Sequence, residues 1–161
     1  MSIAELLSGI AKAPIKKRAI TNLNVLNEAY SYPKPSSFSR GMRIDLNGLT
    51  ILLISGTASI DENGKTVHAG DFRAQTRRSY ANISALLEAE GASWKDVVRT
   101  SCYLRDIDHD YAAFNEERTA FFKEQGLDPL PASTGIEARL CRPDLLVEME
   151  AIAMFLTVPK E

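Results

Sequence analysis

The sequence predicts a single domain of the α+β class, in which a mixed β-sheet carries two long helices on one face. Three features predict this class: a strong hairpin signal, two segments with helical periodicity, and a last strand that is apolar on both faces. The elements follow the order hairpin, helix, strand, helix, strand, strand. A chain of 161 residues is long enough to bury the hydrophobic core that such a domain needs.

The hairpin is predicted over residues 42–54. Residues 42–46 alternate between apolar and polar side chains, which is typical of a half-buried strand, and residues 49–54 form a second, apolar strand. Between the two strands, Asn47-Gly48 is a pair that favours the left-handed backbone of a two-residue hairpin turn.

The first long helix is predicted between two flanking signals. Asp71 is expected to cap it, and Gly91 is expected to end it. Ser93 and Asp96 then resemble a capping box, and residues 97–104 predict a strand. The apolar stripe of this helix recurs at helical spacing, at Phe72, Thr76, Tyr80, Ile83 and Leu87.

The second long helix is expected to begin near Asp108 or Asp110 and to end at Gly126. Asn115 lies in the middle of this helix. Because asparagine is mildly unfavourable inside helices, we expect it to form a specific hydrogen bond there. The helix also carries several aromatic side chains, at Tyr111, Phe114, Phe121 and Phe122.

Two further strands are predicted near the C-terminus, one after Pro131 and one over residues 145–155. The second of these has apolar side chains on both faces, and Glu148 and Glu150 lie at the start of one face. A strand that is apolar on both sides must be covered on both sides. Two helices can cover only one face of the sheet, so we expect the other face to meet another subunit.

The segment before the hairpin is predicted to be less regular. Residues 3–11 have the apolar spacing of a short amphipathic helix, which Pro14 would end. Residues 30–37 are too rich in proline and serine for regular structure. We therefore interpret residues 1–16 as an N-terminal helical extension and residues 17–161 as one domain.

Composition limits the expected partners. The 19 basic and 21 acidic residues give a net charge of −2, whereas nucleic-acid binding needs a concentrated cationic face, so we do not expect a nucleic-acid partner. Cys102 and Cys141 have no metal-ligand spacing, and no glycine-rich nucleotide loop is present, so neither metal nor cofactor is expected. Cys102 lies in an apolar run, which predicts a buried structural thiol.

No segment approaches the roughly 18 apolar residues of a membrane span, and no signal-peptide pattern develops, so we expect a cytoplasmic protein.

Two pairs of polar residues could carry chemistry. Glu148 and Glu150 either reach water at a strand end or pair with an arginine such as Arg139, or one of them is a buried carboxylate whose raised pKa lets it activate water. Ser133 and Thr134 place two hydroxyls at the start of a strand, where they are either satisfied by the backbone or available to a ligand. The residue pattern alone leaves these alternatives open.

Taken together, the segments resemble the RidA (YjgF) family over roughly residues 38–156. The resemblance implies a chorismate-mutase-like fold assembled as a homotrimer, with ligand clefts between subunits. It also implies a hydrolase that converts reactive enamine or imine intermediates to 2-keto acids and ammonia, without a cofactor. The motifs that carry the resemblance lie in the family's order and spacing: Ser55-Gly56-Thr57, Gln75, Asn82-Ile83, Gly91 to Val98, Tyr103 to Asp106, Phe114-Asn115-Glu116, Phe121-Phe122, Pro131-Ala132-Ser133 and Val147 to Ala153.

The resemblance also implies roles for individual residues. Glu148 falls on the catalytic glutamate that positions water, and Gly56 falls near the backbone amide that helps to hold the ligand. Asn115 falls on an asparagine of the second helix. Phe38 stands in place of a tyrosine that lines the cleft, so the aromatic ring is kept and the hydroxyl is lost.

Ser133 stands where members of the family carry an arginine that pairs with the substrate carboxylate. A serine can donate one neutral hydrogen bond where the arginine forms a charge-assisted pair, so carboxylate affinity should fall by at least about 1.5–3 kcal/mol. Thr134 lies beside it and is also expected to bind substrate. Either another arginine replaces the missing cation, or the ligand differs. The candidate replacements are Arg40, Arg78 and Arg139.

Three functions are consistent with this pattern. The first is imine or enamine deamination with a replacement cation. The second is hydrolysis of another small metabolite in the same cleft, because residues 131–137 are loosely similar to the related chorismatases, in which Glu148 would be a general acid. The third is a metabolite-binding module without catalysis. Some members of the family are also labelled endoribonucleases, but the acidic balance of this chain makes RNA the weakest candidate. In all three cases we expect a small-molecule ligand and a homotrimer.

Overall fold

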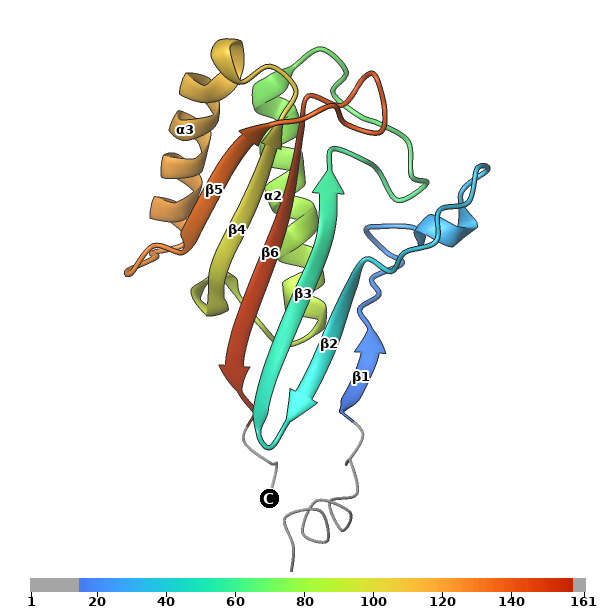
Figure 1. Cartoon of the computed structure of the whole chain (residues 1–161), viewed down its shortest axis with the longest axis vertical. Coiled ribbons are helices and arrows are strands. Elements are labelled where there is room, and N and C mark those ends of the chain that lie inside the picture. The colour runs from blue at the N-terminus through green and yellow to red at the C-terminus, as the bar shows by residue number, and fades with distance from the viewer. Residues whose placement is uncertain (1–14, 158–161) are drawn as a thin grey trace, which may run out of the picture.

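The computed structural model describes residues 15–157, and the helix predicted over residues 3–11 lies outside this range. In the described part, one sheet of six strands carries two long helices on one face (Figure 1). The strand order is β1-β2-β3-β6-β4-β5, and every neighbouring pair is antiparallel except β4 with β5. This mixed sheet confirms the predicted α+β class.

The strands are β1 (Lys16–Ala19), β2 (Gly41–Leu46), β3 (Leu49–Ala58), β4 (Val97–Leu104), β5 (Ala132–Glu137) and β6 (Val147–Leu156). The two long helices are α2 (Phe72–Ala89) and α3 (Ile107–Glu124). Two short 3₁₀ turns, η1 (Ala29–Ser31) and η2 (Trp94–Asp96), complete the described elements.

The hairpin and the first helix form as the sequence predicts. Asn47 and Gly48 both adopt the left-handed backbone, with φ of 48° and 84°, which is the geometry of a two-residue turn between β2 and β3. Asp71 caps α2 by accepting a hydrogen bond from the Ala74 amide at 2.9 Å. Gly91 follows the helix with a φ of 74°, a conformation that glycine adopts without strain.

The start of the second helix was predicted too late. Asp106, and neither Asp108 nor Asp110, is the capping residue, because its carboxylate accepts a hydrogen bond from the His109 amide at 3.0 Å. The helix therefore begins after a two-residue link, Arg105 and Asp106, that follows β4. Asp108 and Asp110 lie instead in the first turn, where negative charge is favourable near the positive end of the helix dipole.

The last strand begins at Val147, two residues later than predicted, and extends to Leu156. The difference at its start has a specific cause. The amide of Leu146 donates a hydrogen bond to Oε1 of Gln75 on α2, at 2.8 Å, instead of to a neighbouring strand. A helix side chain therefore holds the chain just before it enters the sheet.

The N-terminal part of the sheet was not predicted. The four residues of β1 are all exposed and lack an apolar alternation, so only their pairing with β2 identifies them as a strand. The prediction that residues 30–37 are irregular was wrong for the short turn η1, in which the Ser31 amide donates to the Glu28 carbonyl at 2.9 Å.

The hydrophobic core fills the layer between the helices and the sheet. Tyr80 of α2 stacks on Phe121 of α3 with ring centroids 4.4 Å apart, and Trp94 meets Phe121 edge-on at 5.1 Å. Cys102 is buried in this layer, as expected for a structural thiol. The sheet contributes the inward side chains of β6, Val147, Met149, Ala151 and Ala153.

Two buried amide side chains tie α2 to the strand ends that carry the candidate site. Gln75 donates to the Asp144 carbonyl at 2.8 Å and accepts from the Leu146 amide at 2.8 Å, which holds the entry to β6. Asn82 donates to the Ala58 carbonyl at 3.0 Å, which holds the exit from β3. Both side chains are fully buried, so these hydrogen bonds are not replaced by water if they are lost.

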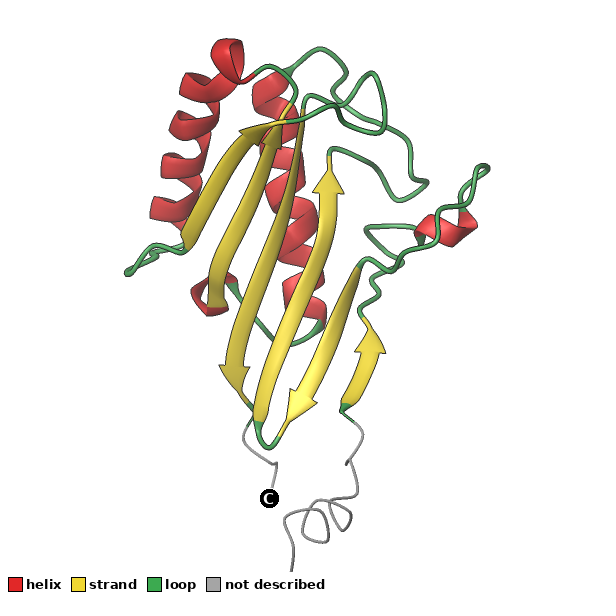
Figure 2. Ribbon diagram, in the orientation of Figure 1, coloured by secondary structure: helices red, strands yellow, loops and turns green. Residues whose placement is uncertain are grey.

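The opposite face of the sheet carries no helix in the part of the chain that the structure describes (Figure 2). Large apolar side chains therefore remain open to solvent there. Leu53 is 40% exposed, Ile136 is 46% exposed and Met154 is 42% exposed. As predicted, the two long helices cover one face of the sheet and leave the other without an internal cover.

We expect Gln75→Ala to lower the free energy of unfolding by about 2 kcal/mol, because it removes the hydrogen bonds of a fully buried side chain to the Asp144 carbonyl and the Leu146 amide. Urea denaturation followed by circular dichroism measures the change. Gln125→Ala at the end of α3 is the control, because the side-chain amide of Gln125 forms no hydrogen bond among the described residues, and it should change stability by less than about 0.5 kcal/mol. Equal losses in the two variants would contradict the role assigned to Gln75.

Candidate functional site

Three of the predicted site residues line one open cavity. Phe38, Gly56 and Glu148 contribute to a hollow of about 760 Å³ beside the start of β6 and the end of β3. Arg40 and Arg142 also contribute to its wall. The cavity therefore combines an aromatic ring, a carboxylate and two guanidinium groups, which suits a small polar ligand.

The carboxylate of Glu148 lies directly against Gly56. The register between β3 and β6 shifts between Ile54 and Thr57, so that the backbone at Gly56 is displaced from regular pairing. A side-chain carbon on residue 56 would overlap Oε1 of Glu148 and would lie 3.0 Å from its Cδ. Glycine is therefore required at position 56 for the carboxylate to occupy this place.

The surroundings of Glu148 change the pKa of its carboxyl group. Burial raises the pKa of its carboxyl above the ordinary value, the nearby charge of Glu150 raises it further, and Arg142 opposes the shift. Glu150 accepts a hydrogen bond from the Tyr103 hydroxyl at 2.9 Å. Among residues 15–157, no side chain donates a hydrogen bond to Glu148, and neither glutamate forms an ion pair with Arg139 or with any other described cation. The carboxylate of Glu148 is thus free to bind a water molecule or a ligand.

The three arginines that were candidates to replace the missing cation at position 133 have different surroundings. Arg40 is buried and donates to the Asn27 carbonyl at 2.8 Å and to the Tyr32 hydroxyl, so its donors are largely occupied within the cavity wall. Arg78 donates to a backbone carbonyl at 3.1 Å at the exit of β3. Arg139 is exposed just beyond β5. None of the three contacts Ser133.

Asn115 and Ser133 come together at a second place, around an arginine that sequence reasoning missed. Arg118 on α3 donates to Oδ1 of Asn115 at 2.6 Å and to Oγ of Ser133 at 3.3 Å. The Thr100 hydroxyl of β4 also donates to Ser133, at 2.9 Å. The hydrogen bond expected for Asn115 is therefore present. The spacing of three residues between Asn115 and Arg118 on one helix face is the signal that could have identified this arginine.

These two groups lie on opposite faces of the sheet. Ser133 is in register with Thr100 and points toward α3, whereas Glu148 is in register with Tyr103 and points to the uncovered face. Thr134, one residue after Ser133, points to the uncovered face and accepts a hydrogen bond from Arg99 at 2.9 Å. A single chain therefore does not bring the predicted site residues together, and Thr134 does not share the surroundings of Ser133.

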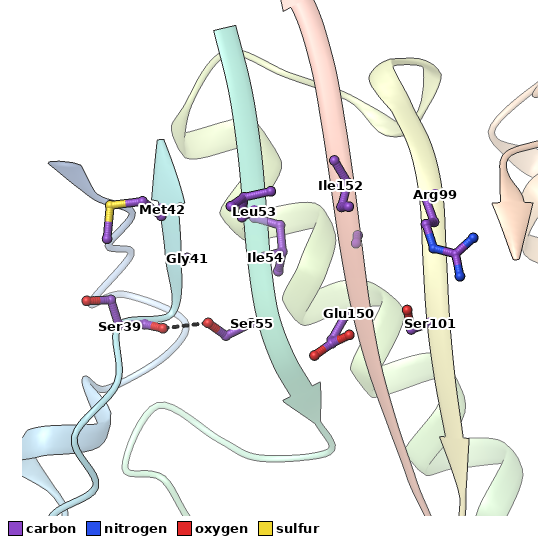
Figure 3. A pocket seen from close by; sticks show the side chains of 11 residues that line it. Ser39, Gly41, Met42, Leu53, Ile54, Ser55, Arg99, Ser101, Glu150 and Ile152 are labelled. Atoms are coloured by element: carbon purple, nitrogen blue, oxygen red, sulfur yellow. Dashed lines mark hydrogen bonds between the residues drawn. The ribbon is translucent and has the colours of Figure 1, made fainter. Parts of the chain in front are cut away.

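A second hollow, of about 440 Å³, lies on the uncovered face of the sheet (Figure 3). Its wall is formed by β2, β3, β4 and β6, and includes Arg99, Ser101 and Glu150. The Ser55 hydroxyl donates to the Ser39 carbonyl at 2.7 Å along one side. The hollow has apolar residues around this polar strip, so it is continuous with the exposed apolar face described above.

The described residues contain no cluster of three or more histidine, cysteine or carboxylate side chains placed to hold a metal ion. Cys102 is buried and Cys141 is exposed, and both are free thiols. No helix within residues 15–157 has the length and apolar character needed to cross a membrane.

Comparison with known sequences identifies relatives of this chain. The family model described as Endoribonuclease L-PSP matches residues 33–155. A RutC family protein of Pyrococcus abyssi is 35% identical over 122 residues, which cover 75% of this chain and 89% of the relative. The 3-aminoacrylate deaminase RutC of Acinetobacter baylyi is 37% identical over 103 residues, covering 64% of this chain and 78% of the relative. The 2-iminobutanoate/2-iminopropanoate deaminase of Salmonella typhimurium is 34% identical over 111 residues, covering 69% and 83% of the two chains.

Comparison with solved structures gives the same result. The crystal structure of the YjgF gene product of E. coli superimposes with a TM-score of 0.67 at 29% identity, covering 84% of this chain and 97% of that one. A Rid family protein of Yersinia pestis gives a TM-score of 0.68 at 27% identity, covering 86% and 98%. The likeness confirms the chorismate-mutase-like fold that the resemblance implied. Because the family model spans most of the chain and the relatives agree with it in sequence and fold, the protein belongs to the RidA (YjgF) family.

Proposed function

We propose that the protein is a homotrimeric hydrolase that converts small enamine or imine acids to 2-keto acids and ammonia in a cleft shared by two subunits. The observation that carries the proposal is the carboxylate of Glu148, which lies over Gly56 in an open cavity and accepts no hydrogen bond from a side chain of the described part of the chain. Two relatives support the substrate class, since they are named 3-aminoacrylate deaminase and 2-iminobutanoate/2-iminopropanoate deaminase and are 37% and 34% identical to this chain.

The geometry suits general acid–base catalysis of imine hydrolysis. Water adds to the carbon of the protonated imine while Glu148 accepts a proton from that water. The same carboxyl then delivers that proton to the nitrogen of the carbinolamine. The carbon–nitrogen bond breaks and ammonia leaves with the bonding electron pair, while the Glu148 carboxylate accepts the hydroxyl proton and leaves the keto group. A raised pKa brings the carboxyl closer to the pH at which it can both accept and return a proton.

The two faces of the sheet support the proposal of a shared cleft. Asn115 and Ser133 lie beside α3, whereas Glu148 and Gly56 lie on the other side, so a ligand can meet both groups only if a second copy supplies one of them. The uncovered apolar face provides the surface on which the copies would associate. A closed trimer buries this face on every subunit.

Hydrolysis of another small metabolite is the second candidate function. It rests on the same raised pKa, because a carboxyl that holds its proton more tightly than usual is suited to act as a general acid toward a leaving group. The two functions differ in the substrate that the native chain turns over. Incubation with 2-iminobutanoate, generated in situ by an amino-acid oxidase, tests the first of them directly.

We expect Glu148→Gln to lower kcat for 2-iminobutanoate hydrolysis by at least about 100-fold while the assembly is retained, since general acid–base catalysis contributes this much. Stability gives a second readout. The folded state holds the Glu148 proton more tightly than the unfolded chain, so ionisation costs stability as the pH rises from the ordinary value of 4.5 through the raised pKa. The variant should therefore be at least as stable as the native protein at neutral pH, with no advantage below about pH 4.

Glu150→Gln is the matched control for this experiment. It removes the same charge two residues further along β6, on the same face, and leaves the Glu148 carboxylate in place, so turnover should persist. Because Glu150 raises the pKa of Glu148, the limb of the pH–rate profile that reports Glu148 should move to lower pH. Full activity of Glu148→Gln would show that its carboxylate has a structural role and no catalytic one. An unchanged pH–rate profile for Glu150→Gln would show that the charge of Glu150 does not affect the pKa of Glu148.

We expect Gly56→Ala to reduce kcat/KM by about 100-fold, because the added methyl group displaces the Glu148 carboxylate and a shift of about 1 Å can cost this much. Gly135→Ala in β5 is the control, since a methyl group there meets no atom closer than 3.8 Å. Light scattering should report the same assembly for both variants. Native turnover by Gly56→Ala would show that the close approach is not needed for catalysis.

Leu53→Glu should convert the proposed trimer to monomers at micromolar concentration, because it places a charge at the centre of the uncovered face. Leu23→Glu introduces the same charge at a position that is 66% exposed and lies outside the sheet, and it should leave the assembly unchanged. Light scattering and sedimentation measure the outcome. A native chain that is monomeric at this concentration would remove the basis for a shared cleft.

A further inference from the structure

Arg118 carries a positive charge that the described residues do not neutralise. No carboxylate among residues 15–157 lies within ion-pair distance of its guanidinium group. The two acidic residues that precede it, Glu116 and Glu117, form ion pairs with Arg73 and Arg77 on α2 at 2.5–3.1 Å. The acidic residues closest in sequence therefore form ion pairs between α2 and α3 and do not neutralise Arg118.

The guanidinium is nevertheless held in a defined position. Nη2 donates to Asn115 at 2.6 Å, and the group lies 5.2 Å from the centre of the Phe114 ring. The contact with Ser133, at 3.3 Å, is long for a hydrogen bond. A guanidinium has five N–H donors, so most of them remain available after these contacts. A cation that is fixed by neutral partners and lacks a counter-ion is well arranged to bind an anion.

Ser133 adds a second donor at the same place. Its oxygen accepts hydrogen bonds from Thr100 and Arg118, which leaves its own hydrogen for a weak contact with Sγ of Cys102 at 3.9 Å or for a ligand. All six residues of β5 are exposed in the single chain, which leaves this group accessible. One hydroxyl and one guanidinium can therefore donate to the two oxygens of a carboxylate together.

We propose that Arg118 is the carboxylate anchor of the substrate site, acting from α3 beside Ser133 and serving Glu148 of the partner subunit. The inference rests on the proposed function and names the residue that binds the carboxylate of its 2-imino and 2-oxo acids. Asn115 is then a positioning residue, because it orients the guanidinium and need not touch the substrate. The positive charge that Ser133 cannot supply from the strand is supplied from the neighbouring helix.

The direct test is carboxylate affinity, measured by calorimetry with 2-oxobutanoate and with 2-oxobutanamide, which lacks the charge. Arg118→Gln should raise the Kd of 2-oxobutanoate by about 10- to 150-fold, which corresponds to the loss of a hydrogen-bonded charge, and should leave the Kd of the amide unchanged. Arg118→Lys should retain part of the affinity, because it keeps the charge and loses the planar fork. Lys123→Gln removes an equivalent charge from an exposed position of α3 and should match the native chain.

A relocation variant tests the position of the charge. Ser133→Arg combined with Arg118→Gln moves the guanidinium from α3 to β5, and it should restore 2-oxobutanoate binding that Arg118→Gln alone has lost. Unchanged 2-oxobutanoate affinity in Arg118→Gln would overturn the inference, and so would equal losses for the acid and the amide. A native chain that binds no 2-oxobutanoate would overturn it as well.

These outcomes are distinguishable from a failure of the proposed function. If the native chain does not hydrolyse 2-iminobutanoate but its affinity for 2-oxobutanoate depends on Arg118, the anchor stands and the reaction is wrong. If hydrolysis is robust and Arg118→Gln leaves KM unchanged, the reaction stands and the anchor is wrong.

Subunit mixing tests whether the anchor serves a partner. Co-expressed Glu148→Gln and Arg118→Gln subunits, isolated as mixed trimers through two different tags, should recover about a third of native activity, since each mixed cyclic trimer pairs two intact half-sites in one of its three clefts. Mixed trimers with no activity above that of the single variants would overturn the assignment of Arg118 to the partner's Glu148.

Discussion

The site depends on one close approach, that of the Glu148 carboxylate to the backbone at Gly56. Two adjacent strands do not normally allow a carboxylate to lie over the backbone of the neighbouring strand. Here the register shift in β3 displaces that backbone, and the absence of a side chain at position 56 leaves room for Oε1. The buried amides of Gln75 and Asn82 then hold the entry to β6 and the exit from β3 against the same helix. The geometry of the carboxylate is therefore a consequence of how α2 is attached to the sheet.

The same arrangement explains why Glu148 is costly for the fold. A carboxyl that is desolvated, lies near a second carboxylate and has no donor among the described residues is less stable in its ionised form than it would be in water. Folded domains usually satisfy buried polar groups, and the exceptions are concentrated where a ligand completes the site. The cavity beside Glu148 and the unused lone pairs of its carboxylate are consistent with such a site.

Charge is distributed between the two faces of the sheet in a complementary way. One face has a carboxylate of raised pKa, and the helix-covered side has, at its exposed edge, the guanidinium of Arg118, which has no counter-ion among the described residues. Within one chain the sheet itself separates these groups, so neither can neutralise the other. Association through the uncovered apolar face offers a way for the two groups of different copies to meet around a small acid, and it removes exposed Leu53, Ile136 and Met154 from water at the same time.

The sequence by itself determined the local elements of this protein, because their signals act over a few residues. The Asn47-Gly48 turn, the Asp71 cap and the two-sided apolar pattern of β6 are each encoded within one segment, and the family resemblance follows from their order. Only the tertiary structure decided which residues share a site. The side on which Ser133 points depends on its register with Thr100, and the contact of Arg118 with Ser133 joins a helix to a strand that the sequence separates by a loop. Register and helix docking are set by packing over the whole core, so the sequence could place Arg118 on the same helix face as Asn115 but could not place it beside Ser133.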